Sequence, residues 1–291
     1  MPYREEVEQR YNEIFENEYA ILLHGRTSNS AMESAESAER GAQHSAMLVT
    51  FTEMYERYHA SENAAKIWNA IYSSHLKRKT GNFSADNLNE EIIEKVVSGA
   101  QSWKKCSGHV FEHYIVEQTR ERLAQYNIRF VLQKELTTML QNNQIANEDE
   151  DNIPQMAASD DFDIYAIVNV NGSNLVFGCV QAKTSIRDRV GRDRDFSIPV
   201  MERHFWSVAV VLDGAYLAMP KFNKMVNGGG ETQYMENGWH GMYSMSNIET
   251  VDRIYKDEDL ELLIEHASEA SHKFTSARQR FDRYWHALQN D

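Results

Sequence analysis

The stretch SDDFDIYAIVNVNGSNLVFGCVQAKTSIRDRVGRDR, residues 159–194, is the most informative part of the 291-residue chain. Residues 164–170 are rich in β-branched side chains, and residues 175–182 resume the same pattern. Between them, Asn171-Gly172-Ser173 is typical of a tight turn that joins two apolar runs. The stretch therefore predicts a β-hairpin whose two open ends lie side by side.

Four polar residues interrupt the apolar runs, all at the open end of the hairpin: Asp161, Asp163, Gln181 and Lys183. With a three-residue loop at 171–173, Asp163 lies opposite Gln181. In the same register Asp161 lies opposite Lys183, and residues two apart share one face of a sheet. A two-residue loop would slip the register by one and separate these side chains. We adopt the three-residue loop, which brings all four together.

These side chains combine oxygen atoms that can bind a metal ion with the positively charged ammonium group of a lysine. Carboxylate and amide oxygens suit Mg²⁺, which keeps several waters and binds through carboxylates and substrate phosphates. A lysine beside such an ion can orient an attacking water and offset the negative charge of a phosphate. A hairpin with solvated polar ends is the ordinary alternative for this pattern.

The order of these residues, followed by Thr-Ser-Ile-Arg-Asp-Arg, resembles that of the PD-(D/E)xK nucleases, and most closely type II restriction endonucleases. The resemblance covers residues 107–220 and has two departures. No proline precedes Asp163, and Gln181 stands where an acidic residue is usual. It implies an α/β fold with a mixed sheet flanked by helices. It also implies Mg²⁺-dependent hydrolysis of double-stranded DNA at a short recognition sequence.

The resemblance also implies roles for individual residues. Asp163 would bind the metal ion, helped by the amide oxygen of Gln181 and the backbone carbonyl of Ala182. Lys183 would position or activate the attacking water. Glu112 would supply the second carboxylate in place of the acid missing at position 181, with Asp161 in reserve. Because a palindromic site has two-fold symmetry, the expected assembly is a homodimer.

Glu112 lies in a segment with two competing interpretations. Gly108-His-Val-Phe-Glu112 resembles a Gly-x-x-Phe-Glu helix that precedes the sheet in many nucleases of this superfamily. The same letters give His109-Val-Phe-Glu112-His113, which fits the H-x-x-E-H signature of inverted zinc proteases. A solvated position on a helix is the third possibility for Glu112.

Composition limits the classes of function. The net charge of −14 argues against a protein that coats nucleic acid without specificity. A local positive field is still present directly after the hairpin, and four arginines there are candidate phosphate contacts: Arg187, Arg189, Arg192 and Arg194. Two cysteines make no disulfide framework, so a reducing cytoplasm is the expected location. No apolar run reaches membrane-spanning length.

The remaining chain predicts a helix-rich protein of two parts. Residues 1–105 form a helical N-terminal subdomain, and residues 106–291 form the catalytic domain with a C-terminal helix. The expected elements are helices at 3–24, 47–58, 64–76, 88–103, 107–126, 197–205 and 257–288, strands at 128–133 and 206–212, and extended chain at 215–219.

Two other functions share these features. A DNA repair or recombination nuclease would use the same chemistry. A DNA-binding protein on a decayed nuclease fold is a further alternative, because Gln181 removes one metal-binding charge.

Overall fold

The computed structural model describes residues 2–24, 31–59, 63–81, 89–149, 151–159, 161–185, 190–246, 248–278 and 282–287. The chain divides into two compact units, Met1–Tyr114 and Ile115–Asp291. The division falls inside helix α4 (Glu90–Ala124), whereas the sequence placed it between residues 105 and 106. Among the described residues, no helix has the length and apolar character needed to cross a membrane.

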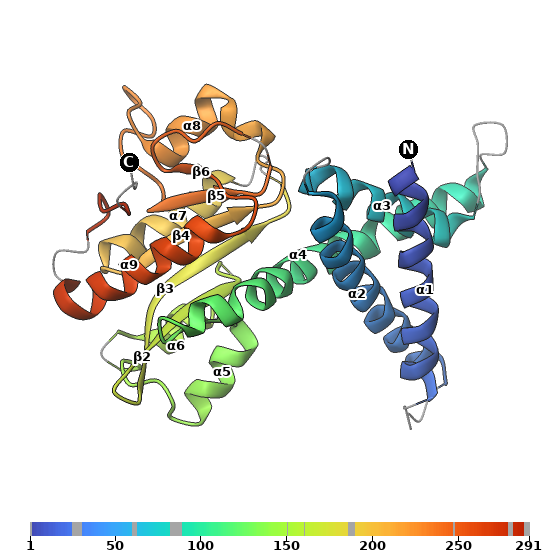
Figure 1. Ribbon diagram of the computed structural model, residues 1–291, viewed down its shortest axis with the longest axis horizontal. Coiled ribbons are helices and arrows are strands. Elements are labelled where there is room, and N and C mark those ends of the chain that lie inside the picture. Colours follow the sequence, from blue (N-terminus) through green and yellow to red (C-terminus); the bar gives the residue numbers. More distant parts are fainter. Residues whose placement is uncertain are drawn as a thin grey trace. The chain divides into compact units, whose positions relative to one another are not determined.

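The N-terminal unit is helical, as the helical periodicity of its sequence led us to expect. It contains α1 (Pro2–His24), α2 (Ala31–Tyr58), α3 (Ala64–Thr80) and the first part of α4 (Figure 1). Its core is aromatic: the ring of Phe51 meets Trp68 and Tyr114 edge to face, at centroid distances of 4.9 and 4.8 Å. The helices predicted at 88–103 and 107–126 are one continuous helix, because neither residues 104–106 nor the Ser107-Gly108 pair that follows them breaks it.

The second unit is built on one six-stranded sheet, whose strand order follows the sequence (Figure 1). The first three strands pair antiparallel and the last four pair parallel, which makes the sheet mixed and confirms the predicted fold class. The strands are β1 (Ile128–Leu132), β2 (Ile164–Val170), β3 (Ser173–Lys183), β4 (Trp206–Val211), β5 (Gly241–Ser244) and β6 (Ile254–Lys256).

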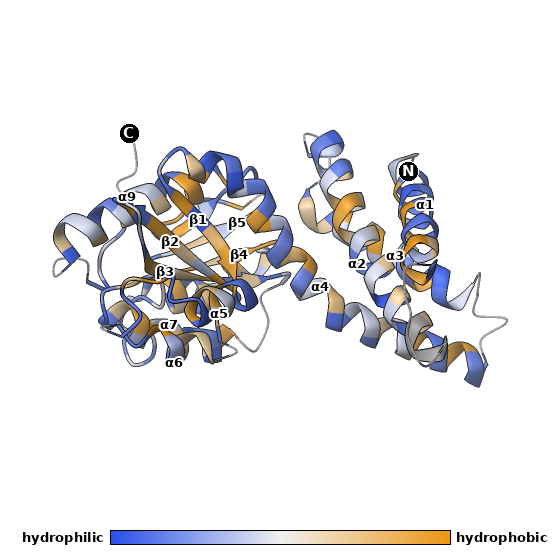
Figure 2. Cartoon of the chain, turned by 90° about the horizontal axis from the view of Figure 1, so that it is seen from below, coloured by the Kyte–Doolittle hydropathy of each residue, from blue (hydrophilic) through white to orange (hydrophobic). Residues whose placement is uncertain are grey.

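Helices cover both faces of the sheet, whose strands are strongly hydrophobic in Figure 2. Ala209 and Val211 of β4 join a buried cluster that includes Val190 at the start of α7 and Met225 of α8. Residues of opposite parity point to the other face, where Phe177 packs against α9 through Phe274. The helices of this unit, besides the end of α4, are α5 (Gln133–Gln141), α6 (Ile153–Ala157), α7 (Val190–Glu202), η2 (Ala215–Ala218), α8 (Pro220–Asn227) and α9 (Glu261–Ala277).

Three sequence expectations at the C-terminal end are corrected. Residues 215–218 form a 3₁₀ helix instead of extended chain. The predicted helix at 257–288 begins only at Glu261 and ends at Ala277. Its start is fixed by the buried carboxylate of Asp257, which accepts hydrogen bonds from the Leu262 and Leu263 amides at 3.1 and 2.9 Å. Strands β5 and β6 were missed because each has four residues or fewer.

The central hairpin reaches the predicted register by a different route. Val170 pairs with Ser173, so the loop has two residues, Asn171 and Gly172, and the three-residue loop was wrong. Both have positive φ, 50° and 88°, as a two-residue type I′ turn requires. A bulge in β3 then shifts the register by one residue, and Ile164 pairs with Val180. Continuing that pairing puts Asp163 opposite Gln181, as predicted.

The C-terminal segment 282–287 packs against the loop before β5 through a buried histidine. His240 accepts the Ser207 N–H at Nδ1 (3.1 Å) and donates from Nε2 to the Asp282 carbonyl (2.9 Å). Both contacts are satisfied by the neutral ring. Burial lowers the pKa of His240 to about 3.

His240 therefore makes the folded state sensitive to acid. The unfolded chain binds a proton near pH 6.5, whereas the folded chain does not, so the His240 contribution is present above pH 6.5 and is lost as the pH falls toward 3. Between pH 7 and pH 5 we expect a loss of about 2 kcal/mol from this group. Urea unfolding at the two pH values should show a smaller difference for His240→Gln than for wild type. His272→Gln, at an exposed position on α9, is the control and should keep the wild-type difference.

Candidate active site

At the open end of the β2–β3 hairpin, the ammonium group of Lys183 lies near the carboxylate of Asp163. Asp163 directly precedes β2 and Lys183 is the last residue of β3, so the strand ends deliver both side chains to one edge of the sheet. The Ala182 amide donates to Asp163 Oδ2 at 2.8 Å and fixes that carboxylate. Lys183 Nζ lies 3.8 Å from the same oxygen. Both side chains are partly open to solvent, with 28% of Lys183 and 23% of Asp163 exposed.

A second carboxylate reaches Lys183 from a different element. Asp193 lies in the first turn of α7, and its Oδ1 is 3.3 Å from Lys183 Nζ, closer than Asp163. Asp193 was not among the site residues predicted from the sequence. The sequence analysis placed the helix at 197–205, whereas α7 begins at Val190. A helix started at 190 would have put Asp193 in its first turn, where helix dipoles favour acidic side chains.

Both the oxygen and the nitrogen of the Gln181 side-chain amide are hydrogen-bonded within the protein. Gln181 is fully buried, and its Oε1 accepts a hydrogen bond from the Trp239 indole at 2.8 Å. Its Nε2 donates to the backbone carbonyls of Asp161 and Asp193, both at 3.1 Å. An indole N–H can only donate and a carbonyl can only accept, so the three partners define the orientation of the amide. The oxygen that was predicted to bind a metal ion thus faces Trp239 in this structure.

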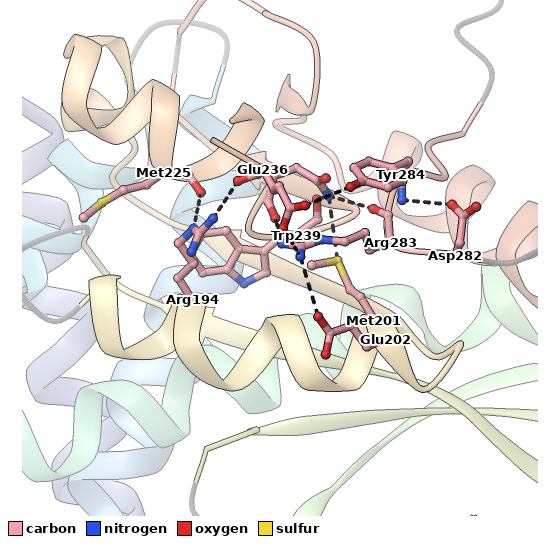
Figure 3. A network of polar contacts seen from close by, with 10 residues as sticks. Arg194, Met201, Glu202, Met225, Glu236, Trp239, Asp282, Arg283 and Tyr284 are labelled. Atoms are coloured by element: carbon pink, nitrogen blue, oxygen red, sulfur yellow. Dashed lines mark hydrogen bonds and ion pairs between the residues drawn. The ribbon is translucent and has the colours of Figure 1, made fainter. Parts of the chain in front are cut away.

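The loop that carries Trp239 is held by two arginines (Figure 3). Arg194 of α7 donates to the carbonyls of Met225, at 3.1 Å, and Glu236, at 2.6 Å. Arg283 donates to the Asn237 carbonyl at 2.8 Å and pairs with the Glu236 carboxylate. These contacts join α7, the end of α8 and the C-terminal segment to the loop before β5.

The four arginines predicted to contact DNA differ in their surroundings. Arg187 and Arg189 lie outside the described residues. Arg192 is 75% exposed at its side chain and lies 3.9 Å from the Asp161 carboxylate. Arg194 is committed to the two backbone carbonyls described above. Contact with DNA stays a prediction for all four.

Glu112 belongs to the N-terminal unit, on α4. Its carboxylate accepts from the His109 ring at 3.0 Å, and the His113 ring packs edge to face on His44 at 4.9 Å between centroids. Among the described residues, no group of three or more His, Cys, Asp and Glu side chains is arranged to hold a metal ion. The histidines of the H-x-x-E-H segment therefore do not form a zinc centre of that kind. The role of Glu112 as second carboxylate stays a prediction.

The donor set beside Lys183 fits a hard divalent cation. Asp163 and Asp193 supply carboxylate oxygens, and both are accessible to solvent at about one fifth of their side-chain surface. Mg²⁺ is typically held by one or two carboxylates, with waters and substrate phosphate completing its shell. Two carboxylates beside one lysine therefore suffice for such an ion without a larger protein cage.

Comparisons with known proteins agree with this chemistry. The model of the BsaWI restriction endonuclease type 2 family matches residues 144–280, a range that contains the hairpin, α7 and all of α9. No curated protein matches the chain. A crystal structure of a pre-specific BsaWI–DNA complex is 42% identical, covers all of both chains and superimposes with a TM-score of 0.66.

A second solved structure supports the fold alone. It is a specific complex of the restriction endonuclease AgeI with DNA, 17% identical, with a TM-score of 0.50. The match covers 88% of this chain and 91% of that one. The zinc-protease alternative is set aside, because the 42% identity over the full length decides the family. The chain belongs to the BsaWI family of type II restriction endonucleases and is a site-specific deoxyribonuclease.

Proposed function

We propose that this endonuclease cleaves both strands of a short palindromic DNA sequence as a homodimer, with Mg²⁺ as the divalent metal ion that its family implies. The observation that carries the proposal is the placement of Lys183 between two carboxylates, Asp163 and Asp193, at the open end of the hairpin. A cation and two acidic groups at a partly exposed sheet edge fit metal-assisted phosphodiester hydrolysis.

Asp163 and Asp193 are the proposed metal ligands, and the Ala182 carbonyl and Glu112 remain predicted ones. When bound, Mg²⁺ supplies Lewis-acid stabilisation of the negative charge on the phosphate. The Ala182 amide holds the Asp163 carboxylate, so its direction is set before the substrate arrives. Lys183 donates from its ammonium group to orient the attacking water and to offset charge as the phosphorus is attacked in line. Its two carboxylate neighbours keep the ammonium at the sheet edge.

A digest tests the proposal. Plasmid and phage DNA incubated with the protein and Mg²⁺ should give discrete fragments, and EDTA should abolish them. A smear would indicate a nuclease without sequence specificity, such as a repair enzyme. Intact DNA at every Mg²⁺ and Mn²⁺ concentration would indicate a decayed nuclease that only binds DNA.

The homodimer follows from symmetry. A palindrome presents the same half-site twice, so two copies related by a two-fold axis can place one active site on each strand. Light scattering on the purified protein with a cognate duplex should give the mass of two chains per duplex. One chain per duplex would contradict the proposed assembly.

Arg192 provides a test of the proposed DNA-facing surface. Its side chain is exposed and lies 3.9 Å from the Asp161 carboxylate, so Arg192→Ala should weaken DNA binding and lower the slope of log affinity against log salt by about one. Fluorescence anisotropy from low to moderate salt measures both quantities. Arg120→Ala is the matched control, because Arg120 is 61% exposed and also pairs with an acid, Glu117. A slope equal to wild type in both variants would make Arg192 ordinary surface.

A further inference from the structure

We propose that Gln181 and Trp239 are a positioning pair: their buried hydrogen bonds fix the backbone that carries Asp193, and thereby place this carboxylate against Lys183. Gln181 then acts through Asp193, and it does not act as a ligand of the metal ion. The inference rests on the proposed roles of Lys183 and Asp193 in cleavage.

The amide of Gln181 joins two segments that the sheet does not otherwise connect. Its Nε2 binds the Asp161 carbonyl, just before β2, and the Asp193 carbonyl, in the first turn of α7. These two carbonyls need two donors from one atom, and a carboxamide nitrogen has two N–H groups. A glutamate at this position would turn a carboxylate oxygen toward two carbonyl oxygens. The local geometry therefore calls for an amide at the position where the wider nuclease superfamily usually has an acid.

Trp239 fixes the other end of the amide. Its indole donates to Gln181 Oε1 at 2.8 Å, and both side chains are fully buried. Trp239 belongs to the apolar cluster under α7 and α8, so its ring has little freedom to follow a displaced glutamine. Its loop is anchored in turn by Arg194 and Arg283 (Figure 3). The direction of the Gln181 nitrogen toward α7 is thus set by packed structure on both sides.

The consequence for catalysis comes from the side chain of Asp193. Its Oδ1 lies 3.3 Å from Lys183 Nζ, and its own carbonyl is the group that Gln181 holds. A shift of the first turn of α7 would move the carboxylate away from the ammonium group and from any ion beside it. Displacements of about 1 Å can cost about a hundredfold in rate when they misplace a reacting group. DNA affinity depends on many phosphate contacts and should change much less.

Two variants test the pair, with Tyr243→Phe as the control. Gln181→Glu should raise the Mg²⁺ concentration for half-maximal cleavage by about tenfold or more, because the carboxylate repels the Asp161 and Asp193 carbonyls that the amide nitrogen holds in place. If Gln181 were instead a metal ligand, the added charge would lower the Mg²⁺ requirement. Trp239→Phe keeps an aromatic ring but removes the donor, and should slow cleavage at saturating DNA by about tenfold. In both variants the affinity for a cognate duplex, measured without metal, should stay within about threefold of wild type.

Tyr243→Phe removes a comparable buried hydrogen bond, between the phenol and His266 Nδ1 at 2.7 Å. Tyr243 lies on β5, two strands from β3, and its side chain is on the opposite face of the sheet from Gln181. Tyr243→Phe should lower the unfolding temperature without changing the Mg²⁺ requirement or the cleavage rate. If Gln181→Glu fails to fold, Trp239→Phe decides alone. Wild-type cleavage by Trp239→Phe, or a lowered Mg²⁺ requirement in Gln181→Glu, would overturn the positioning role. Undiminished cleavage by Lys183→Met and Asp193→Asn would instead overturn the proposed active site on which the inference rests.

Discussion

Lys183→Ala is expected to reduce cleavage by about a thousandfold or more, roughly 4 kcal/mol of transition-state stabilisation, while DNA affinity changes by less than about tenfold. The ammonium group faces two carboxylates at the edge of the sheet. We propose that the scissile phosphate and the attacking water come together at this edge. The charge of the ammonium group matters most when negative charge develops on the phosphate, so its removal raises the barrier and leaves ground-state binding largely intact. Single-turnover cleavage and anisotropy with the same duplex measure the two quantities.

The Mg²⁺ affinity of Lys183→Ala provides a second measurement, because both carboxylates lie beside the lysine. Without Lys183, Asp163 and Asp193 lose a cation that competes with the metal ion, so the Mg²⁺ affinity of the variant should not fall. Calorimetric titration with Mg²⁺ in the presence of the duplex reports this affinity. Lys221→Ala, at an exposed position on α8, is the control and should cleave at the wild-type rate. Near wild-type cleavage by Lys183→Ala would remove this lysine from the mechanism.

The sequence was sufficient for the sheet edge that carries Asp163 and Lys183, because apolar runs rich in β-branched residues and an Asn-Gly turn are local signals. The predicted register at the site is correct although the loop length was wrong. A one-residue bulge in β3 compensates for a loop one residue shorter. Nothing in a single sequence marks that bulge beyond Gly178, where a Cβ would approach the Trp206 carbonyl to 2.5 Å. Asp163 therefore lies opposite Gln181, as predicted, because the shorter loop and the bulge shift the register in opposite directions.

The sequence was insufficient for contacts made by distant segments. Trp239 was not among the site residues predicted from the sequence, yet it is buried against Gln181. Asp193 could not be recognised as a site residue from the sequence, because it lies in a run of alternating charges, and such runs usually form a solvated surface. Only the packing of α7 against the sheet separates Asp193, which faces Lys183, from Arg192, which faces solvent. Such distinctions depend on tertiary structure, and residue type and spacing do not contain them.

Asp193 is the carboxylate that we propose replaces the missing acid at position 181, and its neutralisation should also have a large effect. Asp193→Asn removes one of the two charges beside Lys183 and should raise the Mg²⁺ concentration for half-maximal cleavage by about tenfold. Cleavage at saturating Mg²⁺ should still fall by about a hundredfold, because a neutral amide offsets less positive charge at the site. Asparagine keeps the shape of the side chain and its place in the first turn of α7, so the fold should be retained.

Glu112→Gln is the variant to compare, because the resemblance to PD-(D/E)xK nucleases assigns the second carboxylate to Glu112 and the geometry assigns it to Asp193. If Asp193 alone fills the role, Glu112→Gln should leave the Mg²⁺ requirement unchanged, and the double variant should match Asp193→Asn. If both acids share one ion, each single variant should raise the requirement, and the double variant should depart from additivity. A shift in Glu112→Gln together with none in Asp193→Asn would contradict the assignment made from the structure. The ion would then be held by Asp163 and Glu112, with Asp193 serving only to hold the ammonium group of Lys183 in place.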